Sequence, residues 1–314
     1  MTSGICIKYI NIKAKDRVMR LKNRKMQSAM EYLATYSWAI LFIVVALGVM
    51  YYLGFFSSQA SSIRAQPGSC SVYRPNGAGS TSYLTLAGSC GNQLPQYVAL
   101  FNGNSHILAS IPYLPSGSEP VTVTVWFYYE NTPNIMLLSY GNTSYHGCGD
   151  GNYYSFRIGV DCGSTYIESD PWCSQTCAPT PAPLAKGTWY FAALISNSTG
   201  QTIYGGVDGK LYGKTGGVPS NILSTGQLVI GMGSDGSNLV GGVSNVQVYN
   251  ATLTESELQS LYSEGIGGAP INLQNLIAWY PLNGDANDYS GNQQNGAPFN
   301  ITYSSAWTSG YNAP

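Results

Sequence analysis

The stretch Val121-Thr122-Val123-Thr124-Val125-Trp126-Phe127 consists of β-branched and aromatic residues, which favour extended strands. Similar runs occur on both sides of it, and clusters of Gly, Asn and Pro separate them. The predicted strands are Tyr97–Phe101, Val121–Tyr129, Ile135–Tyr140, Tyr153–Val160, Trp189–Ile195, Thr202–Val207, Leu228–Met232 and Val243–Tyr249. Many short strands with turn signals between them predict an all-β sandwich.

One helix is expected after the last of these strands. Thr254-Glu255-Ser256-Glu257 is a capping box that starts it, and Gly265 marks its end. Residues 276–314 then return to strand and turn signals, with Trp279 and Trp307 among their apolar anchors. We therefore assign 70–275 to the sandwich and 276–314 to strands at its C-terminal side.

Charge is distributed unevenly along the chain, although the net charge is only −1. Eight of the 14 basic residues precede Gln27, together with one acidic residue, Asp16. Six basic and 14 acidic residues follow, which gives −8. Nucleic-acid binding needs a basic footprint, so we expect no nucleic-acid partner.

Residues Leu33 to Phe56 contain no Asp, Glu, Lys, Arg or His. A helix of this length reaches about 36 Å at 1.5 Å per residue, more than the roughly 30 Å hydrocarbon core of a bilayer. We predict a transmembrane helix over 27–57, with 58–69 as a linker or helix continuation. The basic leader, 1–26, is then cytoplasmic, and the C-terminal domain of this single-pass membrane protein or surface filament is extracellular.

Cysteine usage agrees with an extracellular domain. Cys6 lies in the leader, and an even set of six follows the apolar run: Cys70, Cys90, Cys148, Cys162, Cys173 and Cys177. Such a set predicts disulfides, and proximity in sequence suggests the pairs 70–90, 148–162 and 173–177. Reduced, buried thiols are the alternative. Four glycosylation sequons, at Asn142, Asn197, Asn250 and Asn300, lie on the same side.

Lys25-Met26-Gln27-Ser28-Ala29-Met30-Glu31, followed by the apolar run, resembles the class III signal peptide of archaeal type IV pilins. The resemblance implies cleavage by a prepilin peptidase between Met26 and Gln27, with Glu31 as the fifth mature residue. Other pilin-type subunits are then partners. A carboxylate in an apolar helix costs about 2.5–3.5 kcal/mol at mid-membrane, so Glu31 needs a partner such as the new amine of Gln27. An uncleaved membrane anchor is the alternative.

The outer domain resembles the LamG-like, concanavalin A-like jelly roll. Val121–Phe127 matches its central strand, and Gly187-Thr188-Trp189-Tyr190-Phe191 matches the strand that opens its second half. Val207-Asp208-Gly209-Lys210 resembles its hairpin tip, which is a strong turn signal by itself. The similarity spans 97–268 and implies the fold, whereas the ligand varies among such proteins.

Leu276-Ile277-Ala278-Trp279-Tyr280 resembles the first strand of that family, although here it comes last. We predict that 276–314 complete the same sandwich as a circular permutation, because thirty-nine residues are too few to bury a core alone. A truncated second domain is the alternative. The oxygen-rich residues Asp285, Asp288 and Asn292 predict either a calcium site or an Asx-rich turn.

No catalytic residues are predicted, so we expect no enzyme. The Glu-x-Asp-x-x-Glu pattern of glucanases with this fold does not occur, and Glu168 and Asp170 are interpreted as solvated charges in a loop. The loop 142–186 offers aromatic and amide side chains that suit a glycan or protein ligand. We therefore predict a type IV pilin-like surface subunit for adhesion or carbohydrate binding. A non-polymerising, membrane-anchored lectin-like protein and a tethered glycoside hydrolase are the alternatives.

Overall fold

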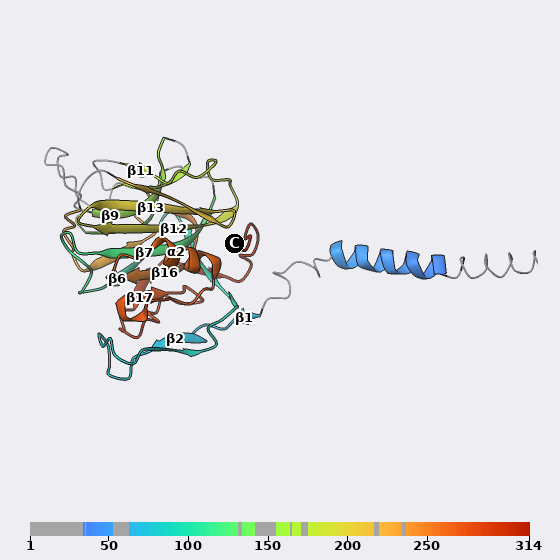
Figure 1. The fold of residues 1–314 in the computed structure, drawn as a ribbon, viewed down its shortest axis with the longest axis horizontal. Helices are drawn as coiled ribbons and strands as arrows, with labels where there is room; N and C mark the ends of the chain where they lie inside the picture. The colour runs from blue at the N-terminus through green and yellow to red at the C-terminus, as the bar shows by residue number, and fades with distance from the viewer. Residues whose placement is uncertain are drawn as a thin grey trace, which may run out of the picture. The chain divides into compact units, whose positions relative to one another are not determined.

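The computed structural model describes residues 34, 36–52, 63–130, 134–141, 155–163, 165–170, 175–216, 220–233 and 237–314. The chain divides into two compact units, Met1–Ser61 and Ser62–Pro314. In the first unit, residues 36–52 form a helix (Figure 1). Among the described residues, no helix combines the length and the apolar character needed to cross a bilayer. The transmembrane helix expected over 27–57 therefore has no support from the structure.

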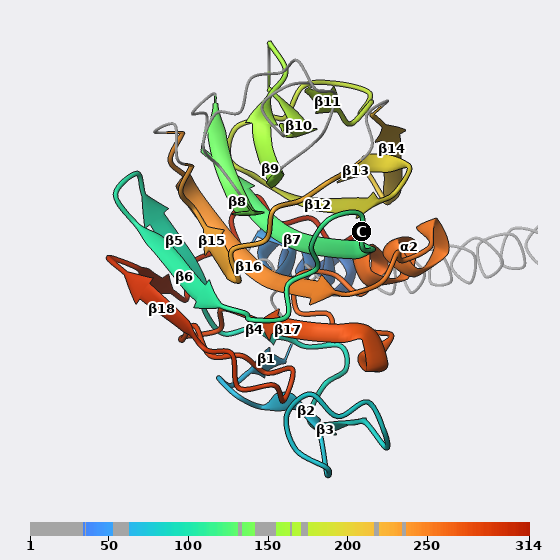
Figure 2. The ribbon, with the colours of Figure 1, turned by 90° about the vertical axis from the view of Figure 1, so that its left-hand side faces the viewer.

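Two large antiparallel sheets form the sandwich of the second unit (Figures 1 and 2). The eight-stranded sheet has the order β14 (Lys210–Thr215), β13 (Gly200–Val207), β12 (Thr188–Asn197), β7 (Val121–Tyr129), β16 (Val240–Tyr249), β5 (Val98–Asn102) and β19 (Thr302–Ser304), and β17 (Leu276–Tyr280) also pairs with β16. The seven-stranded sheet has the order β11 (Thr176–Cys177), β10 (Tyr166–Ser169), β9 (Ser155–Asp161), β8 (Ile135–Gly141), β15 (Gln227–Ile230), β6 (His106–Ser110) and β18 (Gly296–Phe299).

Strand β7 shows why this sequence makes a sandwich. Its odd-numbered residues from Val121 to Tyr129 belong to the core cluster that both sheets share. Trp126 points the other way, into a second apolar cluster on the outer face of the eight-stranded sheet. Because successive side chains of a strand point to opposite faces, a central strand that is covered on both sides buries nearly every residue. Each large apolar side chain buried in this way contributes roughly 1.5–3 kcal/mol.

Helix α2 (Glu255–Ser263) covers part of that outer face through Leu258, Leu261 and Tyr262. The predicted capping box is present: the Thr254 side chain accepts from the Glu257 N–H, and the Glu257 carboxylate accepts from the Thr254 N–H at 2.8 Å. The pair satisfies two backbone donors that a helix start leaves without partners. The expected helix is therefore confirmed.

The eight predicted strands all occur; β7 has the predicted bounds, and the ends of the others differ by at most three residues. The predicted hairpin tip is also confirmed, because Asp208 and Gly209 both have positive φ, 49° and 76°, between the paired strands β13 and β14. Shorter strands such as β6, β10 and β14 were not among the predicted ones. Their pairing depends on neighbours rather than on a strong local pattern.

The C-terminal segment contributes strands to both sheets. β17 runs antiparallel to β16, β18 pairs with β6, and β19 pairs with β5. The side chains of β17 are buried along its whole length. Residues 276–304 are thus part of the same sandwich, while the circular permutation relative to the family stays a prediction.

Candidate functional site

A hairpin precedes the first sandwich strand, formed by β2 (Cys70–Tyr73) and β3 (Thr85–Gly88). A disulfide joins Cys70 to Cys90, with 5.0 Å between their Cα atoms, which confirms this predicted pair. The short parallel strands β1 (Arg64–Ala65) and β4 (Leu94–Pro95) flank the hairpin. The hairpin lies beside β17, at the opposite end of the unit from β11 (Figure 2).

Arg74, directly after β2, fixes the hairpin to the C-terminal segment. Its side chain is buried, and its Nε donates to the main-chain oxygen of Ser290 at 2.7 Å. Nη2 donates to the oxygen of Leu276 at 2.8 Å, and Nη1 donates to that of Ser80. Burial lowers the pKa of Arg74 from its ordinary value, and the charge of Asp288 opposes this shift. The guanidinium is therefore engaged by the protein itself.

The Asp288 carboxylate stabilises the turn that contains Ser290, the residue whose oxygen accepts from Arg74. Its Oδ1 accepts from the N–H groups of Trp279 at 3.0 Å and Ser290 at 2.9 Å. Its Oδ2 accepts from the Ser290 hydroxyl at 2.9 Å and from the Gln294 N–H at 3.0 Å. A carboxylate that accepts several local backbone donors is typical of an Asx-rich turn.

The three residues considered for calcium do not form a cation site in this arrangement. The Asp285 carboxylate accepts from the Asn287 side chain at 2.8 Å and from the Tyr289 hydroxyl at 2.9 Å. Asn292 accepts from the Gly79 N–H at 2.9 Å and donates to the Ile277 oxygen at 2.9 Å. Among the described residues, no three His, Cys, Asp or Glu side chains converge. A calcium ion would have to displace these donors, so the donor set does not fit it.

A cleft of about 510 Å³ opens between the hairpin, the segment before β7 and this turn. We call it the polar cleft. Its polar and aromatic lining comes from separate parts of the chain and includes Arg74, Thr81, Tyr113, Asn250, Asn292 and Gln294. Gln274, in the short 3₁₀ helix η1 (Leu273–Asn275), lines it too. The volume is in the range of ligand-binding clefts.

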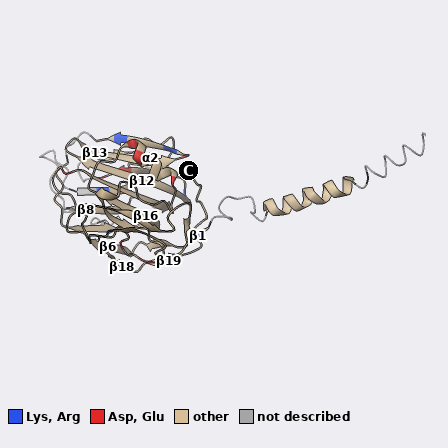
Figure 3. Ribbon diagram, turned by 60° about the horizontal axis from the view of Figure 1, so that its bottom comes forward, with Lys and Arg blue, Asp and Glu red and all other residues tan. Residues whose placement is uncertain are grey.

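The chemistry of the polar cleft suits an uncharged, hydroxyl-rich ligand. Tyr113 is 77% exposed, so its ring offers an apolar face with a polar edge. Asparagine and glutamine side chains both donate and accept hydrogen bonds. Arg74 is the one charged residue in the lining, and its donors are engaged by main-chain oxygens. Few charged residues occur in the whole unit, since most of the ribbon in Figure 3 is tan, and this also suits an uncharged ligand.

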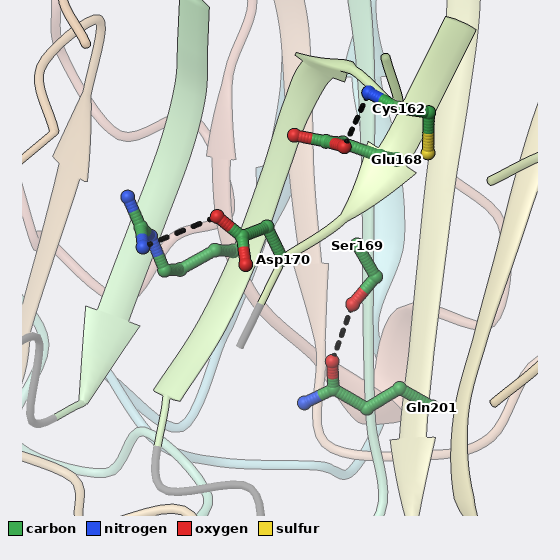
Figure 4. A network of polar contacts seen from close by, with 6 residues as sticks. Cys162, Glu168, Ser169, Asp170 and Gln201 are labelled. Carbon is green, nitrogen blue, oxygen red and sulfur yellow. Dashed lines mark hydrogen bonds and ion pairs between the residues drawn. The ribbon is translucent and has the colours of Figure 1, made fainter. Parts of the chain in front are cut away.

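Figure 4 shows a second polar region, at the end of the sandwich formed by β9, β10 and β11. A disulfide joins Cys162 to Cys177 there, with 6.0 Å between the Cα atoms. The predicted pairs 148–162 and 173–177 are therefore wrong, because β10 pairs with both β9 and β11 and so brings distant cysteines together. Cys148 and Cys173 lie outside the described residues.

Glu168 and Asp170 are not the solvated loop charges that the sequence suggested. Glu168 is only 2% exposed within β10, and its carboxylate accepts from the Cys162 N–H at 2.9 Å. Burial raises the pKa of Glu168 to about 7, and the neighbouring charge of Asp170 adds to this shift. Asp170 forms an ion pair with the fully buried Arg157 at 3.5 Å (Figure 4). Neither carboxylate lines the polar cleft.

Ser169 lies on the opposite face of β10 from Glu168. Its hydroxyl donates to the Gln201 side chain on β13 at 2.6 Å, which connects the two sheets (Figure 4). The pair Tyr166-Ile167, aromatic and β-branched, was a weak strand signal in the sequence. It could have indicated that these residues leave the loop.

The other predicted site residues have varied surroundings. The Asn197 side chain accepts from the N–H and hydroxyl of Thr199, at 2.8 and 2.6 Å. Asn250 is exposed and lines the polar cleft, and Asn300 lies in a turn with φ 52° between β18 and β19. Besides Cys148 and Cys173, four predicted site residues lie outside the described part of the chain: Met26, Gln27, Glu31 and Asn142.

Comparison with solved structures finds many chains that match this one. A candidate carbohydrate-binding protein of Bacteroides ovatus matches over 70% of this chain and 67% of its own, with 18% identity and a TM-score of 0.49. The heptameric pentraxin of Limulus polyphemus matches over 66% and 94%, with 16% identity and a TM-score of 0.49. Domain 4 of a Geobacillus stearothermophilus arabinanase matches over 52% and 75%, with 16% identity and a TM-score of 0.39.

No curated protein sequence matches this chain. A laminin G family model, described as the concanavalin A-like lectin/glucanases superfamily, matches residues 101–259. That match covers just over half of the chain and runs from β5 through most of α2. It agrees with the expected jelly roll. The chain therefore belongs to the concanavalin A-like lectin/glucanases superfamily.

Proposed function

We propose that this chain displays a carbohydrate-binding domain at the cell surface, and that the polar cleft holds a neutral sugar. The observation that carries the proposal is the combination of an exposed aromatic ring, Tyr113, with the exposed amide side chains of Asn250 and Gln274 around one cleft. Aromatic rings pack against the apolar faces of sugars, and amides bond their hydroxyls. Family membership adds support, because lectins are part of the superfamily.

The supports of the cleft are rigid, which favours a preformed site. Arg74, Asn292 and Asp288 all hydrogen-bond to backbone groups of neighbouring segments. A preformed site loses less entropy when a ligand binds. Tyr113 and Gln274, by contrast, are exposed and so stay available to a ligand.

A glycan array probed with the purified full-length chain tests the proposal. We expect selective binding of neutral glycans, and we expect Tyr113→Ala to weaken it about tenfold, as the loss of one aromatic stacking contact does. Gln274→Ala should weaken it a few-fold, in line with one lost hydrogen bond of about 1 kcal/mol. Tyr83→Ala is the matched control, because Tyr83 is 83% exposed and does not line the cleft.

Equal binding by the Tyr113→Ala and wild-type chains would refute the cleft as the site. Binding of a protein partner that sugars do not compete for would favour the alternative of a protein ligand. Release of reducing sugar ends from a bound glycan would favour a tethered glycoside hydrolase. Repeating the array with a chelator tests the calcium interpretation, and we expect no change because the Asp285 and Asp288 oxygens are engaged by donors.

For the N-terminal part we infer a type IV pilin-like subunit of archaeal type. The support comes from the sequence: a basic leader ends at Lys25, Gln27 and Glu31 have the spacing of a class III signal, and 24 residues without charge follow. N-terminal sequencing of the mature protein tests it. Gln27 as the first residue, together with the chain in sheared surface filaments, would support a pilin-like subunit. An intact leader would favour a non-polymerising membrane anchor.

A further inference from the structure

Asn250 has a position that none of the other described sequons shares. It follows β16 directly, its side chain is exposed, and it lines the polar cleft. It also lines a second cleft of about 430 Å³, together with Tyr113 and Glu119. Asn250 and Tyr113 thus form the wall that the two clefts share. A group attached to the Asn250 side chain would therefore lie next to Tyr113 and both clefts.

We propose that Asn250 carries an N-linked glycan whose first sugars pack against Tyr113 and fill the polar cleft from within the same chain. The inference rests on the proposed function, because it needs an extracellular residue 250 and a cleft that suits sugars. Asn250-Ala251-Thr252 is an acceptor sequon, and Thr252 is exposed as well. The backbone there leaves the sheet, with the Asn250 N–H donating to the Asn275 oxygen at 2.9 Å, so the side chain is accessible.

The modification joins Asn250 Nδ2 to the anomeric carbon of an oligosaccharide. The new N–C bond forms as the C–O bond to the diphosphate of an activated glycosyl carrier breaks, and Nδ2 loses one proton. The carrier diphosphate leaves with the electron pair of the broken bond. The product keeps the amide neutral and adds hydroxyl groups beside Tyr113, Gln274 and Asn292.

Attachment makes the contact intramolecular, so the sugar meets the cleft at a high effective concentration. A glycan at Asn250 therefore competes with any glycan from outside. Asn197 and Asn300 line neither cleft. Asn197 also has its side-chain oxygen bound to Thr199 in an exposed loop. Glycans on these two residues should leave the polar cleft open.

Mass spectrometry of the protein purified from the cells that make it provides the first measurement. The peptide that contains Asn250 should carry the mass of a glycan, and the Thr252→Ala chain from the same cells should lack it. Thr252→Ala keeps Asn250 in place, and Thr199→Ala is the matched control for the sequon at Asn197. An unmodified Asn250 in the native protein would overturn the inference.

Tyrosine-selective labelling provides the second measurement and needs no added ligand. We expect Tyr113 to be labelled about threefold more slowly in the glycosylated wild-type chain than in the Thr252→Ala chain, because the sugar covers its ring. Tyr83 should be labelled equally in both. Equal labelling of Tyr113 in the two chains would also overturn the inference.

The glycan array separates this inference from the proposed function. If the Thr252→Ala chain binds glycans about tenfold more tightly than the wild type, the result supports both the proposed function and the intramolecular contact. If Asn250 is modified and Tyr113 is shielded but no variant binds external sugars, the proposed function fails while the intramolecular contact stands.

Discussion

The Nε of Arg74 donates to the main-chain oxygen of Ser290 at 2.7 Å, across 216 positions of sequence. With its bonds to the oxygens of Leu276 and Ser80, this guanidinium ties the hairpin to the turn behind the polar cleft. Arg74→Ala removes donors from buried carbonyl oxygens, so we expect a loss of about 2–4 kcal/mol in the free energy of unfolding. Arg74→Lys should recover only part of it, since a lysine lacks the forked donors of arginine.

Urea denaturation of the two variants measures this effect. Lys210→Ala is the matched control, because Lys210 is exposed at the start of β14, and it should change stability by less than about 0.5 kcal/mol. An Arg74→Ala chain as stable as the wild type would show that the hairpin does not depend on this side chain.

Asp288 accepts four hydrogen bonds, one from Trp279 on β17 and three from Ser290 and Gln294. Asp288→Asn places an amide donor against other donors, so we expect a loss of about 1–3 kcal/mol in stability. Asp208→Asn, in an exposed turn at positive φ that asparagine tolerates, should be nearly neutral. Thermal melting with calcium and with a chelator should give the same midpoint. A clear rise of the midpoint in calcium would contradict the Asx-turn interpretation and favour an ion at this turn.

Glu168 makes the stability depend on pH. Burial raises its pKa from 4.5 to about 7 in the folded protein, so the folded state holds this proton more tightly than the unfolded state. The contribution is therefore fully present below pH 4.5 and is lost as the pH rises towards 7. The loss is on the order of 3 kcal/mol, from the size of the pKa shift. Urea unfolding at several pH values in this window measures it.

Glu168→Gln keeps an acceptor for the Cys162 N–H and cannot ionise, so its stability should depend less on pH in this window. Glu264→Gln, at an exposed helix end, should follow the wild type. If the Glu168→Gln and wild-type curves are parallel, another group causes the pH dependence.

Trp279, on β17, joins the C-terminal segment to the sheet through its indole. Its Nε1 donates to the Asn245 side chain at 2.8 Å, and the residue is only 3% exposed. Trp279→Phe removes this bond and some buried surface, so we expect a loss of about 2–3 kcal/mol in stability. Because the variant lacks one of the tryptophans that give the fluorescence signal, unfolding should be followed by circular dichroism. Phe299→Ala, at a half-exposed edge position, should cost much less.

Several elements were predicted correctly from the residue pattern within a short stretch of sequence. The β-branched and aromatic run Val121–Tyr129 predicted β7, the Thr254–Glu257 pair predicted the start of α2, and Asp208-Gly209 predicted a hairpin tip. Each depends on residues within one strand or one turn. Proximity in sequence also predicted the pair Cys70–Cys90 correctly, because the hairpin of β2 and β3 brings the two cysteines together.

Contacts between distant segments were not predictable in the same way. Proximity in sequence gave wrong partners for Cys162 and Cys177, since the pairing of β9, β10 and β11 decides which cysteines meet. Glu168 looked like a solvated charge because its burial depends on the strand it joins. The polar cleft has no sequence signature, since its lining comes from five separate parts of the chain.

The sequence by itself determined the fold class, the capped helix, the family and the asymmetry of charge, because each follows from composition or from spacing within a short stretch. Only the tertiary structure decided where Arg74 inserts, which oxygens Asp288 offers to donors, and that Asn250 and Tyr113 share one wall between two clefts. These relationships arise from the pairing and packing of segments up to two hundred residues apart. A pattern of neighbours along the chain does not encode such distances, because many packings satisfy the same local preferences.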